Sequence, residues 1–111
     1  MDPQNVPNVP VGELRDGVRL LDVREHDEWS AGHAPDAVHI PLGELPARLA
    51  ELPDADALYV VCRSGGRSAR AAAYLNANGW EAVNVDGGMH SWHANGRKLV
   101  AENPGADPEV I

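Results

Sequence analysis

The fold is decided by the stretch Ala57-Leu58-Tyr59-Val60-Val61-Cys62-Arg63-Ser64-Gly65-Gly66-Arg67-Ser68. Its first five residues are apolar or aromatic, and such a continuous run is typical of a buried parallel strand. The two glycines end this pattern. The alanine-rich segment that follows, from Arg67 or Ser68 to Asn78, predicts a helix. Because strand, loop and helix follow one another directly, we expect Cys62 at the carboxyl end of a central strand.

Short strand-like and helix-like segments alternate along the rest of the chain. Besides 57–61, the sequence predicts strands at 6–9, 19–23, 37–40 and 82–85, and helices at 11–15, 25–31, 43–52 and 89–94. Prolines around the first strand place it at a sheet edge. The alternation predicts an α/β fold in which a parallel sheet of about five strands is covered by helices on both faces. In such sheets ligands bind at the carboxyl ends of the strands.

Length and charge limit the class of protein. The 111 residues fit a single domain, 1–111, with a core over about 8–98 and a loosely ordered tail at 97–111. Seventeen acidic against nine basic side chains give a formal net charge of −8, which argues against nucleic acid or an anionic membrane as a partner. Because we find neither a secretory signal nor an apolar run near the roughly 18 residues of a membrane span, we expect a soluble cytoplasmic protein.

Cys62 is the single cysteine of the chain and the candidate nucleophile. Between a strand end and a helix start, a thiol meets converging backbone N–H groups and the positive end of the helix dipole, and both favour the thiolate. Arg63 and Arg67 add guanidinium groups suited to an oxyanion. The other loop residues are small and let the backbone curl around the sulfur: Ser64, Gly65, Gly66 and Ser68. The alternative is an inert buried residue that merely ends a strand.

The absence of a second cysteine restricts what Cys62 can do. It can form no internal disulfide and has no internal resolving thiol, so any covalent adduct must pass to a small molecule or to another protein's thiol. The histidines at 33, 39, 90 and 93 offer no ligand set at metal spacing, and we interpret them as structural or exposed. The sequence therefore predicts no metal site.

Two other predicted strands end in polar or glycine residues. Asp22 and Arg24 follow the strand at 19–23, and Asp86-Gly87-Gly88 follows the strand at 82–85. Because the carboxyl ends of parallel strands share one rim, we expect both groups near Cys62. We predict that Asp22 and Arg24 form a supporting hydrogen-bond and ion-pair network behind the loop, with direct participation in the chemistry as the alternative.

Four segments in chain order resemble signatures of the rhodanese family of sulfurtransferases, in particular its single-domain members. They are Leu21-Asp22-Val23-Arg24-Glu25 with Glu28-Trp29, Gly32-His33-Ala34-Pro35-Asp36-Ala37-Val38-His39-Ile40-Pro41, the loop from Cys62 to Ser68, and Asp86-Gly87-Gly88-Met89 with Trp92. The resemblance covers roughly residues 8–98 and implies a rhodanese-like fold.

The resemblance also implies a thiosulfate sulfurtransferase activity without a separate cofactor. Cys62 would take sulfane sulfur from a donor such as thiosulfate, release sulfite, hold the sulfur as a persulfide and pass it to cyanide or a thiol. Arg67 and the loop amides would hold the donor and stabilise the persulfide. A sulfur-accepting protein is a further expected partner.

Two other functions are compatible with a cysteine loop of this kind. A phosphatase or arsenate reductase also cradles a thiolate, but such enzymes place five residues between cysteine and arginine, whereas four separate Cys62 from Arg67. A non-enzymatic binding or signalling module on the same fold usually lacks the cysteine or the charge of the loop, and this chain has both. The sequence leaves the physiological donor, the acceptor and the oligomeric state open.

Overall fold

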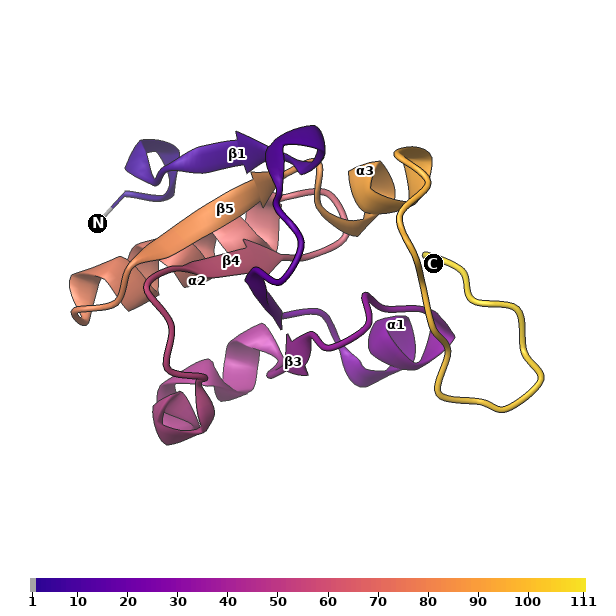
Figure 1. The fold of residues 1–111 in the computed structure, drawn as a ribbon. Coiled ribbons are helices and arrows are strands. Elements are labelled where there is room, and N and C mark those ends of the chain that lie inside the picture. The colour runs from indigo at the N-terminus through magenta and orange to yellow at the C-terminus, as the bar shows by residue number, and fades with distance from the viewer. Residues whose placement is uncertain (1) are drawn as a thin grey trace.

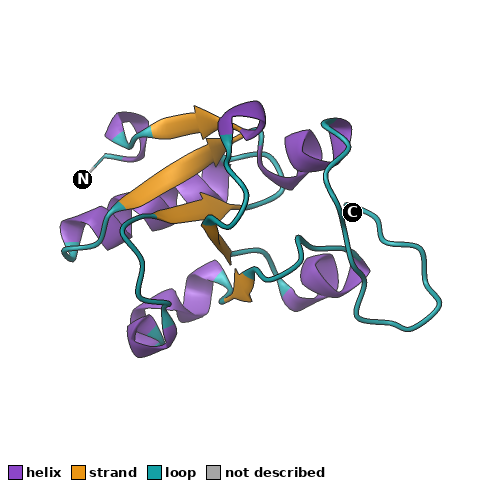
Figure 2. Ribbon diagram, viewed as in Figure 1, coloured by secondary structure: helices purple, strands orange, loops and turns teal. Residues whose placement is uncertain are grey.

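The computed structural model describes residues 2–111, which form one five-stranded sheet with the strand order β1-β5-β4-β2-β3. The strands are β1 (Asn8–Pro10), β2 (Arg19–Asp22), β3 (Val38–His39), β4 (Leu58–Val61) and β5 (Ala82–Asp86). The α-helices are α1 (His26–Ala31), α2 (Gly66–Ala77) and α3 (Gly88–Ala94). All the strand pairings are parallel, so the predicted parallel α/β fold is confirmed. Figures 1 and 2 show the arrows of β1, β5 and β4 pointing the same way.

Strand β4 lies at the centre of the sheet, as its apolar sequence predicts. It pairs with β5 on one side and β2 on the other, with Val60 opposite both Asn84 and Leu21. Its side chains alternate between the two faces: Leu58 and Val60 enter one apolar cluster, whereas Tyr59 and Val61 contact the other. Burial on both faces explains why this segment lacks the polar alternation of a half-exposed strand.

The two apolar clusters lie on opposite faces of the sheet. The first packs α2 and the 3-10 helix Leu42–Ala47 against the strands, and it includes Cys62. The second contains α3 side chains together with Val11 of the 3-10 helix Val11–Glu13. In Figure 1, α2 runs behind β4 and β5, whereas α3 lies beyond the tips of their arrows. The carboxyl end of β4 therefore meets the beginning of α2 and the beginning of α3.

Two predicted helices have the expected place but a different form. The segment predicted as a helix over 43–52 forms two 3-10 helices, Leu42–Ala47 and Leu49–Glu51. Pro46 lies inside the first of them, and its ring and missing N–H prevent regular α-helical hydrogen bonding. The segment at 11–15 is likewise a single 3-10 turn, Val11–Glu13.

The C-terminal segment differs from the expected loose tail at several anchored positions. It forms an isolated antiparallel bridge between His33 and Val100, and the Glu109 N–H donates to the Ala31 carbonyl at 2.9 Å. Leu99 and Val110 pack against the second apolar cluster. Figure 1 shows this segment, in yellow, running past α1. Because its contacts are with residues far away in the sequence, no local sequence pattern predicts them.

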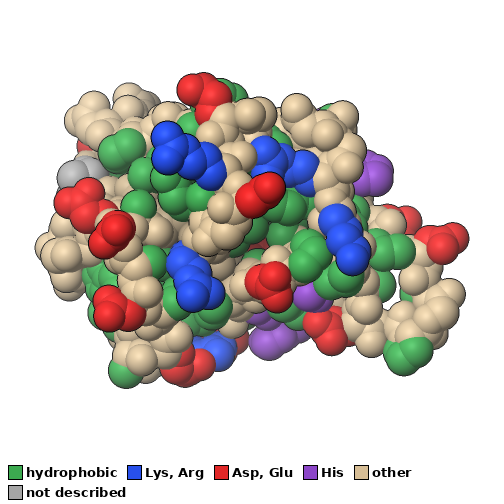
Figure 3. All heavy atoms as spheres, in the orientation of Figure 1, with side chains coloured by type: hydrophobic (Ala, Val, Ile, Leu, Met, Phe, Trp, Pro, Cys, Tyr) green, Lys and Arg blue, Asp and Glu red, His purple; other side chains and the backbone are tan. Residues whose placement is uncertain are grey.

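Charge is distributed without a dominant basic surface on the face drawn in Figure 3, where lysine and arginine side chains lie apart from one another among acidic and apolar ones. Between residues 2 and 111, no helix has the length and apolar character needed to span a membrane.

A buried ion pair closes the end of β2. Arg24 Nη2 lies 2.7 Å from Asp22 Oδ2, and Arg24 Nε lies 3.0 Å from Asp22 Oδ1. The second bond of Arg24 Nη2 goes to the Gly32 carbonyl at 2.8 Å. The side chains of Arg24 and Asp22 are 0% and 1% exposed. The pair therefore ties the end of β2 to the residue that follows α1.

We expect the substitution Asp22→Asn to cost about 3–5 kcal/mol in the free energy of unfolding, because it leaves the Arg24 charge buried without its counter-ion. The matched control is Glu44→Gln, which removes a carboxylate that lies 2.9 Å from Arg48 at the surface. This control should unfold at nearly the same urea concentration as the unsubstituted protein, because water screens such pairs. Equal losses in the two variants, measured by urea denaturation, would contradict the structural role of the buried pair.

Candidate active site

Cys62 follows β4 directly, and its loop ends where α2 begins at Gly66. The residue is 1% exposed. Its Sγ accepts the Gly65 N–H at 3.0 Å and lies 3.3 Å from the Ser68 hydroxyl oxygen. Gly65 has a φ of 119°, a backbone conformation that residues other than glycine rarely adopt. In this conformation its N–H points at the sulfur. The loop and the start of α2 thus bring hydrogen-bond donors to the sulfur.

The start of α3 holds the loop in this shape. The N–H groups of Met89 and His90 donate to the carbonyls of Cys62 and Arg63 at 2.8 and 2.9 Å. Because these carbonyls are turned toward α3, the N–H groups of the following residues can face the sulfur. The approach requires glycine at position 88, where a Cβ atom would lie 2.4 Å from the Cys62 carbonyl oxygen. Gly88, which follows β5, therefore lets the start of α3 approach the cysteine loop.

Hydrogen bonding makes Cys62 more acidic than an ordinary cysteine. Burial raises the pKa of its thiol, but hydrogen bonds from the Ser68 side chain and from the Ser68, Gly65 and Ser64 N–H groups outweigh it and lower the pKa overall. A thiolate is the nucleophilic form of cysteine. The loop can therefore present a reactive sulfur within an otherwise buried site.

The two arginines of the loop are already engaged by other parts of the chain. Arg67 donates through Nη1 and Nη2 to the Glu28 carboxylate on α1, at 2.7 and 2.8 Å. These bonds hold the pKa of Glu28 below its usual range and raise the pKa of Arg67. Arg63 is exposed and donates through Nε to the Ile111 carbonyl at 3.0 Å. An oxyanion that enters the site has to compete with Glu28 and with the C-terminal segment for these groups.

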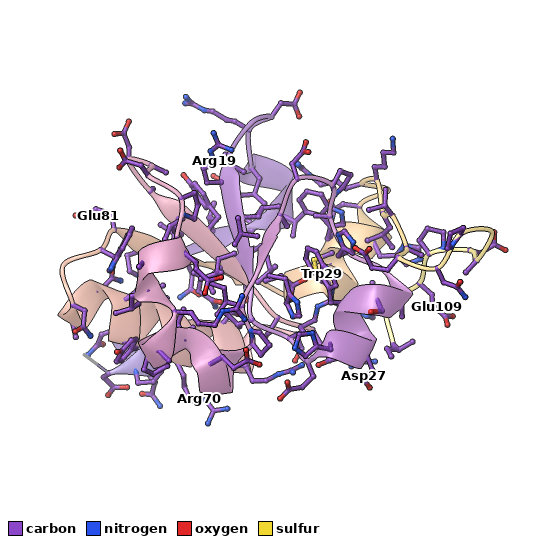
Figure 4. All side chains as sticks on the ribbon, turned by 90° about the horizontal axis from the view of Figure 1, so that it is seen from below. Arg19, Asp27, Trp29, Arg70, Glu81 and Glu109 are labelled. Atoms are coloured by element: carbon purple, nitrogen blue, oxygen red, sulfur yellow. The ribbon has the colours of Figure 1, made fainter. Side chains whose placement is uncertain are left out.

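Arg70, the third arginine near the cysteine in sequence, lies outside the site. It is exposed, and Figure 4 shows its side chain pointing outward from α2. Arg70 therefore belongs to the surface, although it lies only about one helical turn after Arg67.

The histidines near the rim serve as packing and hydrogen-bonding groups. The Trp29 ring is stacked between His33 at 3.5 Å and His39 at 4.6 Å, measured between ring centroids. His39 Nε2 lies 2.7 Å from the Arg24 carbonyl oxygen, and His33 Nε2 lies 2.7 Å from Glu102 Oε1. In Figure 4, Trp29 extends from α1 toward the middle of the molecule, whereas Asp27 points away. Within the described part of the chain, no three or more His, Cys, Asp or Glu residues are placed to hold a metal ion.

The structure brings the predicted loop residues together around one sulfur and adds three groups that the sequence analysis did not assign to the site. They are the Glu28 carboxylate, the N-terminal amides of α3 and the Asn84 side chain. A signal for Asn84 was present, because a polar residue within the apolar strand Ala82-Val83-Asn84-Val85 needs a buried partner. Its partner is Ser68, whose hydroxyl lies 2.5 Å from Asn84 Oδ1.

Substituting Gly88 with alanine should weaken the hydrogen bonds that α3 makes to the loop, because the new Cβ would collide with the Cys62 carbonyl. We expect the pH midpoint for alkylation of Cys62 by iodoacetamide to rise toward that of an ordinary thiol, about 8.5. Gly79→Ala is the matched control, since Gly79 also has a positive φ but has no other atoms within 4 Å of the added Cβ. An unchanged midpoint in folded Gly88→Ala protein would show that α3 does not set the acidity of the thiol.

Comparison with known proteins identifies the family. The family model described as "Rhodanese-like domain" matches residues 11–95. "Putative sulfurtransferase YtwF" of Bacillus subtilis is 44% identical over 81 residues, which cover 72% of this chain and 78% of that protein. A protein of Allochromatium vinosum named "Sulfurtransferase" is 39% identical over 85 residues, which cover 76% of this chain and 79% of that protein.

A solved structure supports the same assignment at the level of the fold. The crystal structure of a rhodanese-related protein from Thermoplasma volcanium superposes with a TM-score of 0.79 at 31% sequence identity, covering 85% of this chain and 97% of that one. The resemblance inferred from the four sequence signatures is thus confirmed by the family model, by the relatives and by the fold. The chain belongs to the rhodanese-like domain family.

Proposed function

We propose that this protein is a sulfurtransferase that carries sulfane sulfur as a persulfide on Cys62. Sulfur transfer as the general chemistry is supported by the family and by relatives named as sulfurtransferases. The observation that carries the proposal is the position of Cys62 Sγ, which lies 3.0 Å from the Gly65 N–H and has a lowered pKa. The loop amides and the Ser68 hydroxyl suit a negatively charged sulfur at this position.

The first half of the proposed reaction uses a donor such as thiosulfate. The Cys62 thiolate attacks the outer sulfur of thiosulfate, and a new S–S bond forms to Cys62 Sγ. The S–S bond of the donor breaks at the same time, and its electron pair leaves with sulfite. Arg67 binds the donor's oxygens in exchange for part of its contact with Glu28, because a guanidinium can pair with either oxyanion.

The second half returns the enzyme to its starting state. Cyanide or a thiolate attacks the terminal sulfur of the persulfide, forming thiocyanate or a new persulfide, and the electron pair of the broken S–S bond returns to Cys62 as thiolate. Since the chain holds no second cysteine, the acceptor is a small molecule or a thiol on another protein. The proposal requires no metal and no other cofactor.

Treatment with thiosulfate should add one sulfur atom to the intact protein, a mass gain of about 32 Da, and cyanide should remove it. The substitution Cys62→Ser should abolish both the mass gain and the transfer of sulfur from thiosulfate to cyanide, because serine forms no persulfide. Intact-protein mass spectrometry and a thiocyanate assay measure the two results.

Two outcomes would contradict the proposal. Sulfur transfer that persists in the Cys62→Ser variant would place the chemistry elsewhere. No mass gain with any sulfane donor would favour a non-enzymatic binding or signalling module over an enzyme.

A further inference from the structure

A row of polar side chains leads from the Cys62 sulfur across the sheet to its edge. The Ser68 hydroxyl oxygen lies 3.3 Å from Cys62 Sγ and 2.5 Å from Asn84 Oδ1. Asn84 Nδ2 in turn donates to Asn8 Oδ1 on the edge strand β1 at 2.8 Å. Ser68 and Asn84 are 0% and 4% exposed, so water has little access to the inner part of the row.

The direction of these hydrogen bonds is fixed from the edge inward. Asn8 Nδ2 donates to the Val6 carbonyl at 3.2 Å, and a carbonyl can only accept. Asn8 must therefore turn its Oδ1 toward Asn84, and Asn84 must donate to it through its amide nitrogen. The remaining atom of that amide, Oδ1, then faces Ser68 and can only accept a hydrogen bond.

Ser68 has one hydroxyl proton and three acceptors within reach. They are Cys62 Sγ at 3.3 Å, the Gly65 carbonyl at 3.1 Å and Asn84 Oδ1 at 2.5 Å. The shortest contact is to Asn84, whose buried oxygen would lose its partner if the proton left. When the sulfur is protonated, its S–H can donate to Ser68 Oγ while Ser68 donates to Asn84. Once the sulfur is ionised, Ser68 can donate to it only by giving up Asn84.

We propose that Asn84 is a positioning residue that competes with the Cys62 sulfur for the Ser68 proton, and that Asn8 fixes the orientation in which it does so. The proposal rests on the proposed function only in taking Cys62 as the nucleophile. Its consequence is that Asn84 opposes the ionisation that the loop amides promote. A sulfur that is loaded and uncharged at Sγ lets the proton return to Asn84, so Asn84 favours the loaded site over the empty thiolate.

Neither asparagine substitution removes a charged group. The charged and titratable groups on the elements that meet at the site are Glu25 and Glu28 from α1, Arg67 from α2, Arg63 from the loop, Asp22 with Arg24 at the end of β2, Asp86 at the end of β5 and His90 from α3. A change in the acidity of Cys62 after substitution of an asparagine therefore reports the hydrogen bonds and not a lost charge.

The test is the pH profile of Cys62 alkylation by iodoacetamide. In Asn84→Leu, which offers no acceptor to Ser68, we expect the midpoint to fall by about 0.5–1 pH unit, the equivalent of one neutral hydrogen bond. The substitution Asn8→Ala at the exposed edge should lower the midpoint too, because the freed Asn84 amide can turn its nitrogen toward Ser68. In a Ser68→Ala background, Asn84→Leu should cause no further shift.

Asn76→Leu is the matched control. Asn76 on α2 also makes two side-chain hydrogen bonds, both to the Ala82 backbone, at 2.7 and 3.0 Å, but none to Ser68. It should lower stability and leave the midpoint unchanged.

An unchanged or raised midpoint in folded Asn84→Leu and Asn8→Ala would overturn the proposal, and so would the same shift in the Ser68→Ala background. If Asn84→Leu does not fold, the exposed Asn8→Ala variant decides. Because alkylation is measured and not sulfur loading, failure here is distinguishable from failure of the proposed function.

Discussion

The structure of the site depends on two backbone hydrogen bonds from α3 to the cysteine loop. By taking the carbonyls of Cys62 and Arg63 at 2.8 and 2.9 Å, the amides of Met89 and His90 turn the loop so that its own N–H groups converge on the sulfur. Without them the loop carbonyls would be free to face inward and repel a negative sulfur. Parallel strands make this possible, because β4 and β5 end at the same rim and deliver the loop and α3 to each other.

Less free positive charge acts on Cys62 than the sequence indicates. Arg67 is paired with the Glu28 carboxylate, whereas Arg63 keeps its charge but is exposed and donates to the Ile111 carbonyl. The groups that lower the pKa of Cys62 are neutral backbone amides and one hydroxyl. Unlike Arg67, these neutral donors stabilise a thiolate without having to leave a paired carboxylate. This arrangement fits the proposed reaction, in which the sulfur at the site is negatively charged both before and after loading.

Features carried by local sequence could be predicted, and features carried by distant contacts could not. The central strand at 57–61 and the rim position of Cys62 follow from one apolar run and the glycines after it. The prediction of a regular helix over 43–52 was wrong, because Pro46 lies inside the segment and prevents α-helical hydrogen bonding despite the helical spacing of the leucines. The partner of Asn84 and the anchors of the C-terminal segment lie far away in sequence, so their roles appear only when the sheet order is known.

The central claim is that the folded loop, and not the cysteine's own chemistry, makes this thiol acidic. It is tested most directly by measuring the pH dependence of Cys62 alkylation in the native protein and again in denaturant, where the same thiol has lost the loop. We predict a native midpoint below the denatured one, which should lie near the ordinary value of about 8.5. A native midpoint equal to or above the denatured one would contradict the account, because burial would then outweigh the hydrogen bonds to the sulfur.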